Sequence, residues 1–202
     1  MRKITSALSL ALIALLCFAF KGDKMLPLGA TAPMVDYEML GVDDQGHTLA
    51  SLKGEKGLLV IFSCNTCPFV LGWEDQFPKL GGMAKNLNIG MALVNSNTAK
   101  RDNEDSLEEM KKHYKEANYN CAYVLDEENQ LADAFGAKTT PHVYLFDADM
   151  QLVYRGSVNN KYELKSKEAT DFYLEKALKA LANGEKVAPA DTREMGCSIK
   201  RG

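Results

Sequence analysis

The chain has 202 residues, a formal net charge of −3 and 46% hydrophobic residues, which fits one globular domain with a full hydrophobic core. A slightly acidic chain has no electrostatic attraction for nucleic acid, so no nucleic-acid partner is expected. A domain of this size has little need of disulfide staples, so its cysteines do not indicate a structural disulfide framework.

Residues 1–24 have the layout of an export signal. Basic residues precede an almost unbroken apolar stretch at 7–20, which is too short to cross a bilayer comfortably. We therefore expect an exported, periplasmic or otherwise extracytoplasmic protein. The Phe-Ala-Phe at 18–20 is not a clean cleavage site, so a retained membrane anchor stays open. Cys17 is interpreted as apolar filler of this segment. Cleavage would change the net charge from −3 to −6, because four basic residues and one acidic residue are removed.

Strand and helix patterns alternate along the rest of the chain. Strands are expected at 34–39 and 48–52 as a short hairpin or meander, at 57–63, 89–94, 121–125 and 142–146, and as a hairpin strand at 152–156. Helices are expected at 67–86, with a kink or break near Pro78 and Gly81-Gly82, and at 106–117, 129–135 and 168–183. This alternation predicts an α/β sandwich around a central sheet.

Cys64 and Cys67 lie three positions apart, where the expected strand 57–63 stops and a helix begins. The first N–H groups of a helix have no intrahelical partner and carry partial positive charge, so they favour a thiolate over a thiol. A neighbouring thiol one turn away can attack the resulting mixed disulfide and release the partner. The pair therefore predicts a thiol–disulfide oxidoreductase that uses Cys64 and Cys67.

Four sequence blocks together resemble the peroxiredoxin-like branch of the thioredoxin superfamily, of the alkyl hydroperoxide reductase and thiol-specific antioxidant type. They are residues 29–33, the KGEKGLLVIFSCNTCPFV block at 53–70, the TTPHVYLFDADMQLVYRG block at 139–156 and the GCSIK block at 196–200. The resemblance implies an α/β thioredoxin-like fold, with a central mixed β-sheet flanked by helices and an N-terminal β extension. It also implies a redox-active Cys64/Cys67 pair with no cofactor. The expected parts are 1–24, a thioredoxin-like domain at 25–183 and a tail at 184–202.

The resemblance gives Thr140 and Pro141 a place in the site. It implies a cis peptide bond before Pro141, with the proline packed beside the cysteine pair. The backbone of Thr140 could then receive an extended peptide, which makes these two residues the expected substrate groove.

Two mechanisms assign the first attack to different thiols. In the thioredoxin-like one, Cys64 is the more exposed thiol at the helix N-cap and attacks, and Cys67 resolves; this is our prediction. In the alternative, a thiol peroxidase, Cys67 attacks a hydroperoxide and Cys64 condenses with the sulfenic acid. The family's peroxidases carry threonine or serine where this chain has Cys64, and proline where it has Val60. We therefore expect that the peroxide-binding pocket is not intact. Arg155 is interpreted as a solvated strand residue rather than a replacement.

Proton handling must also differ from that of thioredoxin, because Ser63 stands where thioredoxin has a tryptophan before its first cysteine. Candidate proton acceptors for the resolving thiol are Lys56, Glu74 and Asp75, although each is interpreted first as a surface charge. Trp73 is expected in the core or the groove wall.

Two further cysteines lie outside the motif. Cys197 is in a tail with the composition of a loose terminus. Either the tail folds back and Cys197 exchanges with Cys64 or Cys67 as a third redox thiol, or the thiol is packed under Ile199 or paired with Cys121. Cys121 is expected to be a buried structural residue.

A second alternative is copper or zinc binding through the two cysteines and His142. It lacks ligands, because structural zinc sites use four and the three histidines have no metal-ligand spacing; we expect no metal. The expected partners are a protein or small-molecule disulfide, or a hydroperoxide. In an oxidising compartment a membrane or periplasmic donor must supply electrons if the pair is to reduce anything.

Overall fold

The computed structural model describes residues 24–202, so the predicted export segment and Cys17 lie outside the described residues, apart from Lys24. The strands are β1 (Met39–Gly41), β2 (Gly46–His47), β3 (Gly57–Ser63), β4 (Ile89–Asn95), β5 (Ala122–Leu125), β6 (Thr139–Thr140), β7 (His142–Asp147), β8 (Leu152–Gly156) and β9 (Cys197–Ser198). The helices are α1 (Leu49–Leu52), α2 (Pro68–Trp73), α3 (Phe77–Asn86), α4 (Leu107–Glu116), α5 (Gln130–Phe135) and α6 (Tyr173–Ala182). Within 24–202, no helix is long and apolar enough to cross a membrane.

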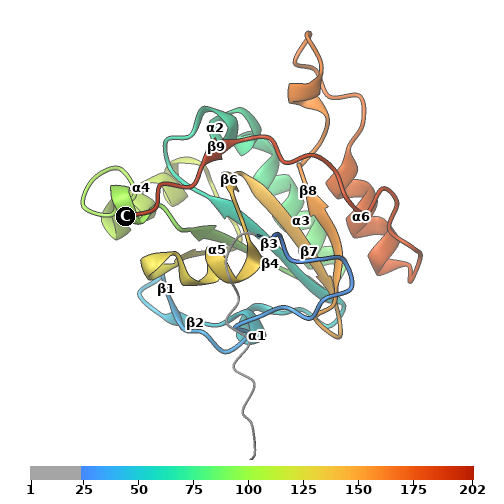
Figure 1. The fold of residues 1–202 in the computed structure, drawn as a ribbon, viewed down its shortest axis with the longest axis horizontal. Helices are drawn as coiled ribbons and strands as arrows, with labels where there is room; N and C mark the ends of the chain where they lie inside the picture. The colour runs from blue at the N-terminus through green and yellow to red at the C-terminus, as the bar shows by residue number, and fades with distance from the viewer. Residues whose placement is uncertain (1–23) are drawn as a thin grey trace, which may run out of the picture.

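Seven strands form one mixed sheet in the order β2-β1-β5-β4-β3-β7-β8 (Figure 1). The central strands β3, β4 and β5 are parallel, and β7, β8 and β1 are antiparallel to their neighbours. The β1–β2 hairpin attaches to β5 as the expected N-terminal extension. The mixed α/β architecture is the one that the sequence predicted.

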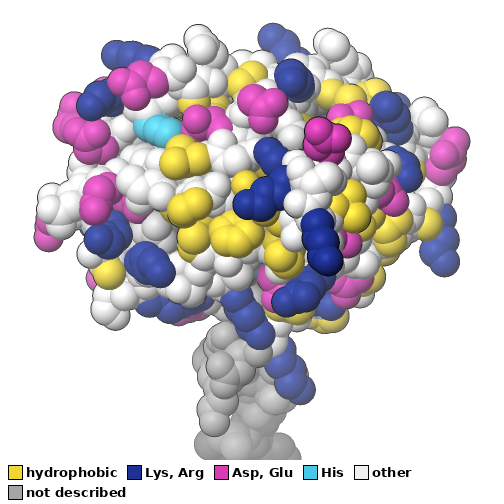
Figure 2. All heavy atoms as spheres, turned by 90° about the horizontal axis from the view of Figure 1, so that it is seen from above, with side chains coloured by type: hydrophobic (Ala, Val, Ile, Leu, Met, Phe, Trp, Pro, Cys, Tyr) yellow, Lys and Arg dark blue, Asp and Glu magenta, His cyan; other side chains and the backbone are white. Residues whose placement is uncertain are grey.

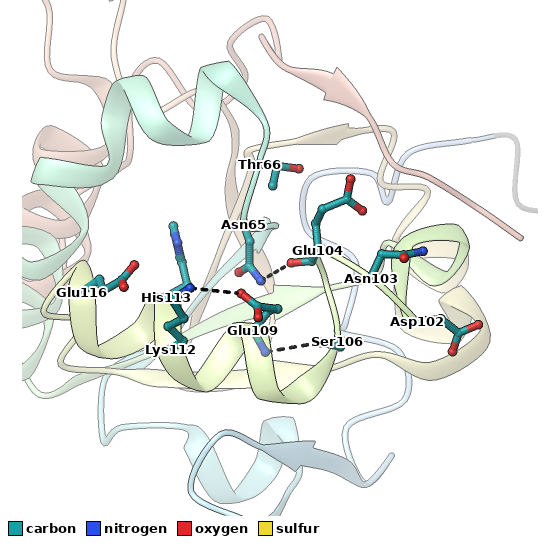
Figure 3. A pocket seen from close by; sticks show the side chains of 10 residues that line it. All are labelled: Asn65, Thr66, Asp102, Asn103, Glu104, Ser106, Glu109, Lys112, His113 and Glu116. Carbon is teal, nitrogen blue, oxygen red and sulfur yellow. Dashed lines mark hydrogen bonds and ion pairs between the residues drawn. The ribbon is translucent and has the colours of Figure 1, made fainter.

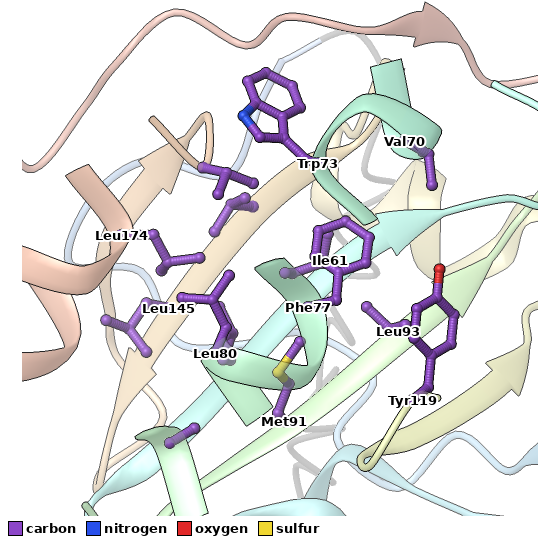
Figure 4. Packing of buried hydrophobic residues seen from close by; sticks show 14 of the residues in the cluster. Ile61, Val70, Trp73, Phe77, Leu80, Met91, Leu93, Tyr119, Leu145 and Leu174 are labelled. Atoms are coloured by element: carbon purple, nitrogen blue, oxygen red, sulfur yellow. The ribbon is translucent and has the colours of Figure 1, made fainter. Parts of the chain in front are cut away.

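Strand β3 is central because its side chains are apolar on both faces, as expected for a strand covered on both sides. Leu59 and Ile61 point into the core formed with α2, α3 and α6 (Figure 4). Leu58, Val60 and Phe62 point into a second core beneath α5. The two cores fix the direction of β3, and with it the place where the chain leaves the sheet at Ser63.

The predicted helix 67–86 is broken just before Pro78 and not at the two glycines. A 3-10 turn at Glu74–Gln76 separates α2 from α3, and Pro78 follows in the first turn of α3. Proline is tolerated there because the first N–H groups of a helix have no intrahelical partner. Gly81 and Gly82 continue α3 without a break.

Three predicted elements were wrong in kind or extent. The strand expected at 34–39 begins only at Met39, because residues 34–37 form a turn in which Tyr37 N donates to the Met34 carbonyl at 3.0 Å. Residues 48–52 form the short helix α1 rather than a strand, because Thr48 and Ser51 make a reciprocal capping box. Helix α6 begins at Tyr173 rather than at residue 168. The N–H groups of Thr170 and Asp171 bond instead to the Asn160 side-chain oxygen, at 2.9 and 3.0 Å, which keeps that stretch out of the helix.

The tail is not the loose terminus that its composition suggested. It crosses the end of the molecule that carries α2 and β6 (Figure 1), and β9 pairs antiparallel with β6. Beyond β9, Ile199 is buried in the second core. The tail is therefore part of the folded structure of the domain.

Candidate functional site

The cysteine pair lies on the turn between β3 and α2. Strand β3 ends at Ser63 and α2 begins at Pro68, so Cys67 is the N-cap residue. Proline is favoured at the first helical position, where its fixed φ suits the helix. This corrects the expectation that Cys64 is the N-cap: the helix begins one turn later, and Cys67 is at its mouth.

Neither thiol is open to solvent. Cys64 is 2% and Cys67 4% exposed, so the expectation that Cys64 is the more exposed of the two was wrong. The loop between them is held by a buried hydrogen bond, in which Tyr123 Oη donates to Asn65 Oδ1 at 2.8 Å. The cysteine turn is therefore a buried and hydrogen-bonded structure.

Hydrogen-bond donors converge on the sulfur of Cys67. The Cys64 thiol, the Cys197 thiol and the Val70 backbone N–H all face it, and Cys197 Sγ is 2.6 Å from Cys67 Sγ. The hydrogen bond from Cys64, followed by those from Cys197 and Val70, lowers the pKa of Cys67 against the opposing effect of burial. The Thr140 carbonyl oxygen is 3.0 Å from Cys67 Sγ and accepts its S–H when the thiol is protonated.

Cys64 has the opposite character. Its hydrogen bond to Cys67, burial and the charge of Asp105 raise the pKa of Cys64, and a contact with Thr140 Oγ1 at 3.4 Å opposes the rise. Cys64 therefore keeps its proton and presents it to Cys67. Two thiols in one turn are driven apart in acidity, which is typical of a reactive thiolate with a protonated partner.

Asp105 is a site residue that the sequence did not reveal. It is fully buried and accepts from Asn65 N at 2.8 Å, Asn95 Nδ2 at 2.8 Å and Asn97 Nδ2 at 2.9 Å. A buried carboxylate needs such donors to offset its lost hydration. Asp105 comes from a run of charged residues that reads as a solvated loop, and no spacing relates it to the cysteines.

Thr140 and Pro141 lie against the thiols, and the peptide bond between them is cis as the resemblance implied. Thr140 contributes its hydroxyl to Cys64 and its carbonyl to Cys67. Its backbone edge is not open, because Cys197 pairs with it in the β6–β9 ladder. The expected groove is occupied by the chain's own tail.

Cys197 reaches this site from 130 residues away along the chain and is half-buried. Burial, followed by its contact with Cys67, raises the pKa of Cys197. Cys121 is elsewhere, packed against the first core, where burial raises the pKa of its thiol to about 12. The four cysteines of the described chain are free thiols, so Cys197 is not paired with Cys121.

The proposed proton acceptors do not contact the thiols. Glu74 pairs with His113 at 2.6 Å, Asp75 with Lys79 at 3.5 Å, and Lys56 Nζ donates to the Ala182 carbonyl at 2.6 Å. Trp73 is fully buried, as expected for a core residue, and donates to Asn159 Oδ1 at 2.8 Å.

Arg155 is not the solvated residue that the sequence suggested. It pairs with Asp191 at 2.6 Å and donates to the Leu26 carbonyl at 2.7 Å. It therefore holds the tail and the N-terminal segment of the domain rather than a ligand beside the thiols.

A polar hollow of about 630 Å³ adjoins the cysteine turn through Asn65 and Thr66 (Figure 3). Its other walls are the loop at 102–104 and one side of α4, and four of its lining residues are acidic. Asn65 Nδ2 closes its inner end by donating to the Glu104 carbonyl at 2.7 Å. Seen from the end that carries α2 and β9, the surface has apolar side chains in its middle among charges of both signs (Figure 2).

No group of three or more His, Cys, Asp or Glu side chains in residues 24–202 is placed to hold a metal ion. His142 is fully buried and lies on β7 beside Tyr144. Burial lowers the pKa of His142 to about 3. No observation in this part of the chain therefore supports the copper or zinc alternative.

Comparison with known proteins agrees with this architecture. An uncharacterized conserved protein from Geobacillus kaustophilus is 31% identical, with 88% of this chain and 94% of that chain covered and a TM-score of 0.78. A hypothetical protein from Sinorhizobium meliloti is 29% identical, with 89% and 97% covered and a TM-score of 0.81. A thioredoxin-like protein solved in its oxidized form shares 20% identity over 78% of this chain and 97% of that chain, with a TM-score of 0.57. A search of curated proteins gives no match.

The fold is thioredoxin-like, with a central mixed sheet flanked by helices, and Cys67 is the N-cap residue of α2. Residues 27–172 match the Redoxin family, and the chain belongs to it. It is accordingly a redox protein, and its specific reaction is a matter for proposal.

Proposed function

We propose that the protein is a thiol–disulfide oxidoreductase that uses Cys64 and Cys67, and that Cys67 makes the first attack. The observation that carries this proposal is the position of Cys67 as the N-cap residue of α2, where hydrogen bonds from the Cys64 thiol and the Val70 N–H lower the pKa of Cys67. The order of attack is the reverse of the one that the sequence suggested, because Cys67 rather than Cys64 is the N-cap residue of α2.

The chemistry needs only the two thiols and the substrate. The Cys67 thiolate attacks one sulfur of a disulfide RS–SR′, forms a mixed disulfide with R and expels R′S⁻. Cys64 gives its proton to R′S⁻ and attacks Cys67 Sγ, which forms the Cys64–Cys67 disulfide and releases RS⁻. Two electrons pass from the protein thiols to the substrate, and the buried Asp105 carboxylate favours the protonated form of Cys64 until the second step.

One observation favours thiol peroxidase as a second candidate. The sulfur with the lowered pKa is Cys67, the residue that a peroxidase mechanism would use. Against it, Cys64 stands where the related peroxidases carry threonine or serine, and the hydroxyl of Thr140 is directed to Cys64 rather than to Cys67.

The test is a redox titration of the purified protein, with insulin reduction and hydroperoxide consumption measured on the same preparation. We expect one two-electron couple, loss of insulin reduction in both Cys64→Ser and Cys67→Ser, and no effect of the matched control Cys121→Ser. Iodoacetamide should modify Cys67 well below pH 8.5, the ordinary pKa of a thiol, because a lowered pKa keeps the thiolate populated as the pH falls. Peroxide turnover that persists in Cys64→Ser would show that the peroxidase assignment is the correct one.

The electron donor follows from the predicted location. If residues 1–24 direct export, the pair acts in an oxidising compartment and requires a membrane or periplasmic donor to stay reduced. The protein substrate is the class that we favour over a small-molecule disulfide, because the sulfur of Cys67 lies beside a backbone edge rather than in an enclosed pocket.

A further inference from the structure

The tail crosses the site in the manner of an extended ligand. Cys197 lies opposite Thr140 and Ser198 opposite Thr139 in an antiparallel ladder. Addition of a strand to a backbone edge is a common mode of peptide recognition, in which main-chain hydrogen bonds give affinity and side-chain pockets give specificity. The edge that could serve an incoming peptide is thus taken by the protein itself.

The crossing segment is held at both ends. Upstream, Ser157 Oγ donates to the Arg193 carbonyl at 2.7 Å. Downstream, Ile199 N donates to the Lys138 carbonyl at 3.0 Å, and the Ile199 side chain is 5% exposed in the second core. These anchors set the register in which Cys197 lies opposite Thr140.

Gly196 makes the docking specific for a residue without a side chain. A Cβ at this position would overlap the Thr140 carbonyl oxygen and come within 2.7 Å of its carbonyl carbon and 3.1 Å of Pro141 N. The backbone at 196 therefore packs directly on the Thr140–Pro141 peptide. Any side chain here must push the segment off the edge.

The thiol that follows this glycine is aimed at the reacting sulfur. Cys197 Sγ is 2.6 Å from Cys67 Sγ, and the Thr140 carbonyl oxygen is 3.0 Å from it. A cysteine-containing peptide substrate would need three features that the tail already has. These are backbone pairing with Thr140, a glycine that allows close approach, and a thiol in contact with the sulfur of Cys67.

We propose that residues 195–199 are a built-in competitor for the substrate, and that they occupy the edge where an extended polypeptide disulfide docks, with Cys197 in the place of the substrate cysteine. The inference rests on the proposed function, because it assumes that Cys67 exchanges with disulfides. It defines the substrate class: a polypeptide whose reactive cysteine follows a glycine in an extended segment.

The same geometry gives Cys197 a reaction that needs no outside oxidant. When Cys64 and Cys67 are joined, the Cys197 thiol loses its proton and the thiolate attacks Cys67 Sγ. The Cys67–Cys197 disulfide forms, the Cys64–Cys67 bond breaks, and the expelled Cys64 thiolate takes up the proton that Cys197 lost. One disulfide is lost and one is formed, so the protein stays oxidised by two electrons. The docked tail thereby competes both for the backbone edge and for the sulfur.

The test uses the full-length reduced protein and an eight-residue peptide with the sequence of residues 193–200, its cysteine joined to thionitrobenzoate. Release of thionitrobenzoate reports attack on the peptide. All proteins carry Cys197→Ser, which removes the competing thiol and keeps the strand. Adding Gly196→Ala should speed the reaction about tenfold, the factor that corresponds to about 1.4 kcal/mol of lost tail docking. Gly82→Ala is the matched control, because a Cβ there meets no neighbour.

A second peptide with alanine in place of its glycine tests the substrate class. It should react about tenfold more slowly than the glycine peptide with the Gly196→Ala protein, because it meets the same Thr140 carbonyl. Equal rates for the two peptides, or equal rates with and without Gly196→Ala, would overturn the proposal that the tail competes with the substrate. Dithionitrobenzoate, a small disulfide without a backbone, separates this failure from failure of the proposed function: only an unreactive Cys67 in every protein would remove both.

Disulfide mapping of the oxidised wild-type protein provides a readout that needs no substrate. Digestion under non-reducing conditions should yield Cys67–Cys197 alongside Cys64–Cys67, and Gly196→Ala should shift the mixture toward Cys64–Cys67 by about tenfold. Cys197 found only as a free thiol under every redox condition would overturn the exchange step.

Discussion

Cys64 and Cys197 approach the same sulfur from opposite directions and are held there by different means. Cys64 is three residues from Cys67 in a turn that is buried and fixed by Asp105 and Tyr123. Cys197 is 130 residues away, half-buried, and carried by a strand of two residues. The first thiol is placed by local structure and the second by tail docking.

The difference suggests a division of roles. A thiol in a turn that buried hydrogen bonds hold has one position, which suits the resolving step of a fixed pair. A thiol on a short edge strand can leave with its segment, since small local openings cost far less than global unfolding. Variants that affect one of the two thiols and leave the other unchanged therefore test this division of roles.

The largest effect is expected for the sulfur that both thiols share. Cys67→Ser should lower disulfide reduction on the order of a thousandfold or more, because the attacking group is lost. It should also abolish both mapped disulfides, Cys64–Cys67 and Cys67–Cys197. Insulin reduction and non-reducing digestion measure these outcomes, with Cys121→Ser as the unchanged control. Activity near the wild-type level in Cys67→Ser would show that Cys64 attacks on its own.

The next effect concerns stability on the Cys64 side. Asp105→Ala should lower the free energy of unfolding by about 3 kcal/mol, since three buried donors lose their acceptor. The corresponding change near the tail, Asp191→Ala, should cost less than about 1 kcal/mol, because its ion pair with Arg155 is partly exposed. Urea denaturation of the reduced proteins measures both. Equal losses would mean that the two sides are held equally firmly.

The parts of the fold that contiguous residues determine could be predicted from the sequence. Strand β3 and the turn that follows it depend on contiguous residues, so the apolar run and the Cys64/Cys67 spacing predicted them. The break before Pro78 was predicted for the same reason. The cis bond at Pro141 came from the resemblance of a whole block, and the Redoxin match supports that resemblance.

The rest depends on contacts between distant segments. Asp105 acts on Asn65 from 40 residues away, and nothing in a charged loop indicates which carboxylate turns inward. The N-cap was misplaced by one turn, because Cys64 and Cys67 both stand before apolar helical residues. The tail was interpreted as loose, since its order comes from β6, Lys138 and the second core rather than from its own composition.

Acid should act first on the tail side. Burial, and then the charge of Arg155, lowers the pKa of His142 to about 3, and Lys138, whose N–H lies 3.4 Å from His142 Nδ1, pairs with Ile199 of the tail. Between pH 6.5, the ordinary value, and pH 3, the unfolded chain binds a proton that the folded chain refuses, so stability is lost as the pH falls.

His142→Asn should therefore reduce the acid sensitivity of the protein. The wild type should lose about 2 kcal/mol more than the variant between about pH 7 and about pH 4.5. Denaturation with urea at the two pH values measures the difference. An identical slope in His142→Asn would show that this histidine does not carry the acid sensitivity.

The smallest effect isolates one hydroxyl. Thr140→Val removes the group 3.4 Å from Cys64 Sγ and leaves the backbone that pairs with Cys197. Because this hydrogen bond lowers the pKa of Cys64, its loss should raise that pKa and slow alkylation of Cys64 about fivefold in a Cys67→Ser background, as expected for about 1 kcal/mol. Thr139→Val is the matched control, since its hydroxyl bonds to the Pro141 carbonyl instead. If Thr140→Val in the otherwise wild-type protein changed the yield of the Cys67–Cys197 disulfide by as much as it changed Cys64 alkylation in the Cys67→Ser background, the two approaches to Cys67 would not be separable. Thr140 would then couple them through its side chain as well as its backbone.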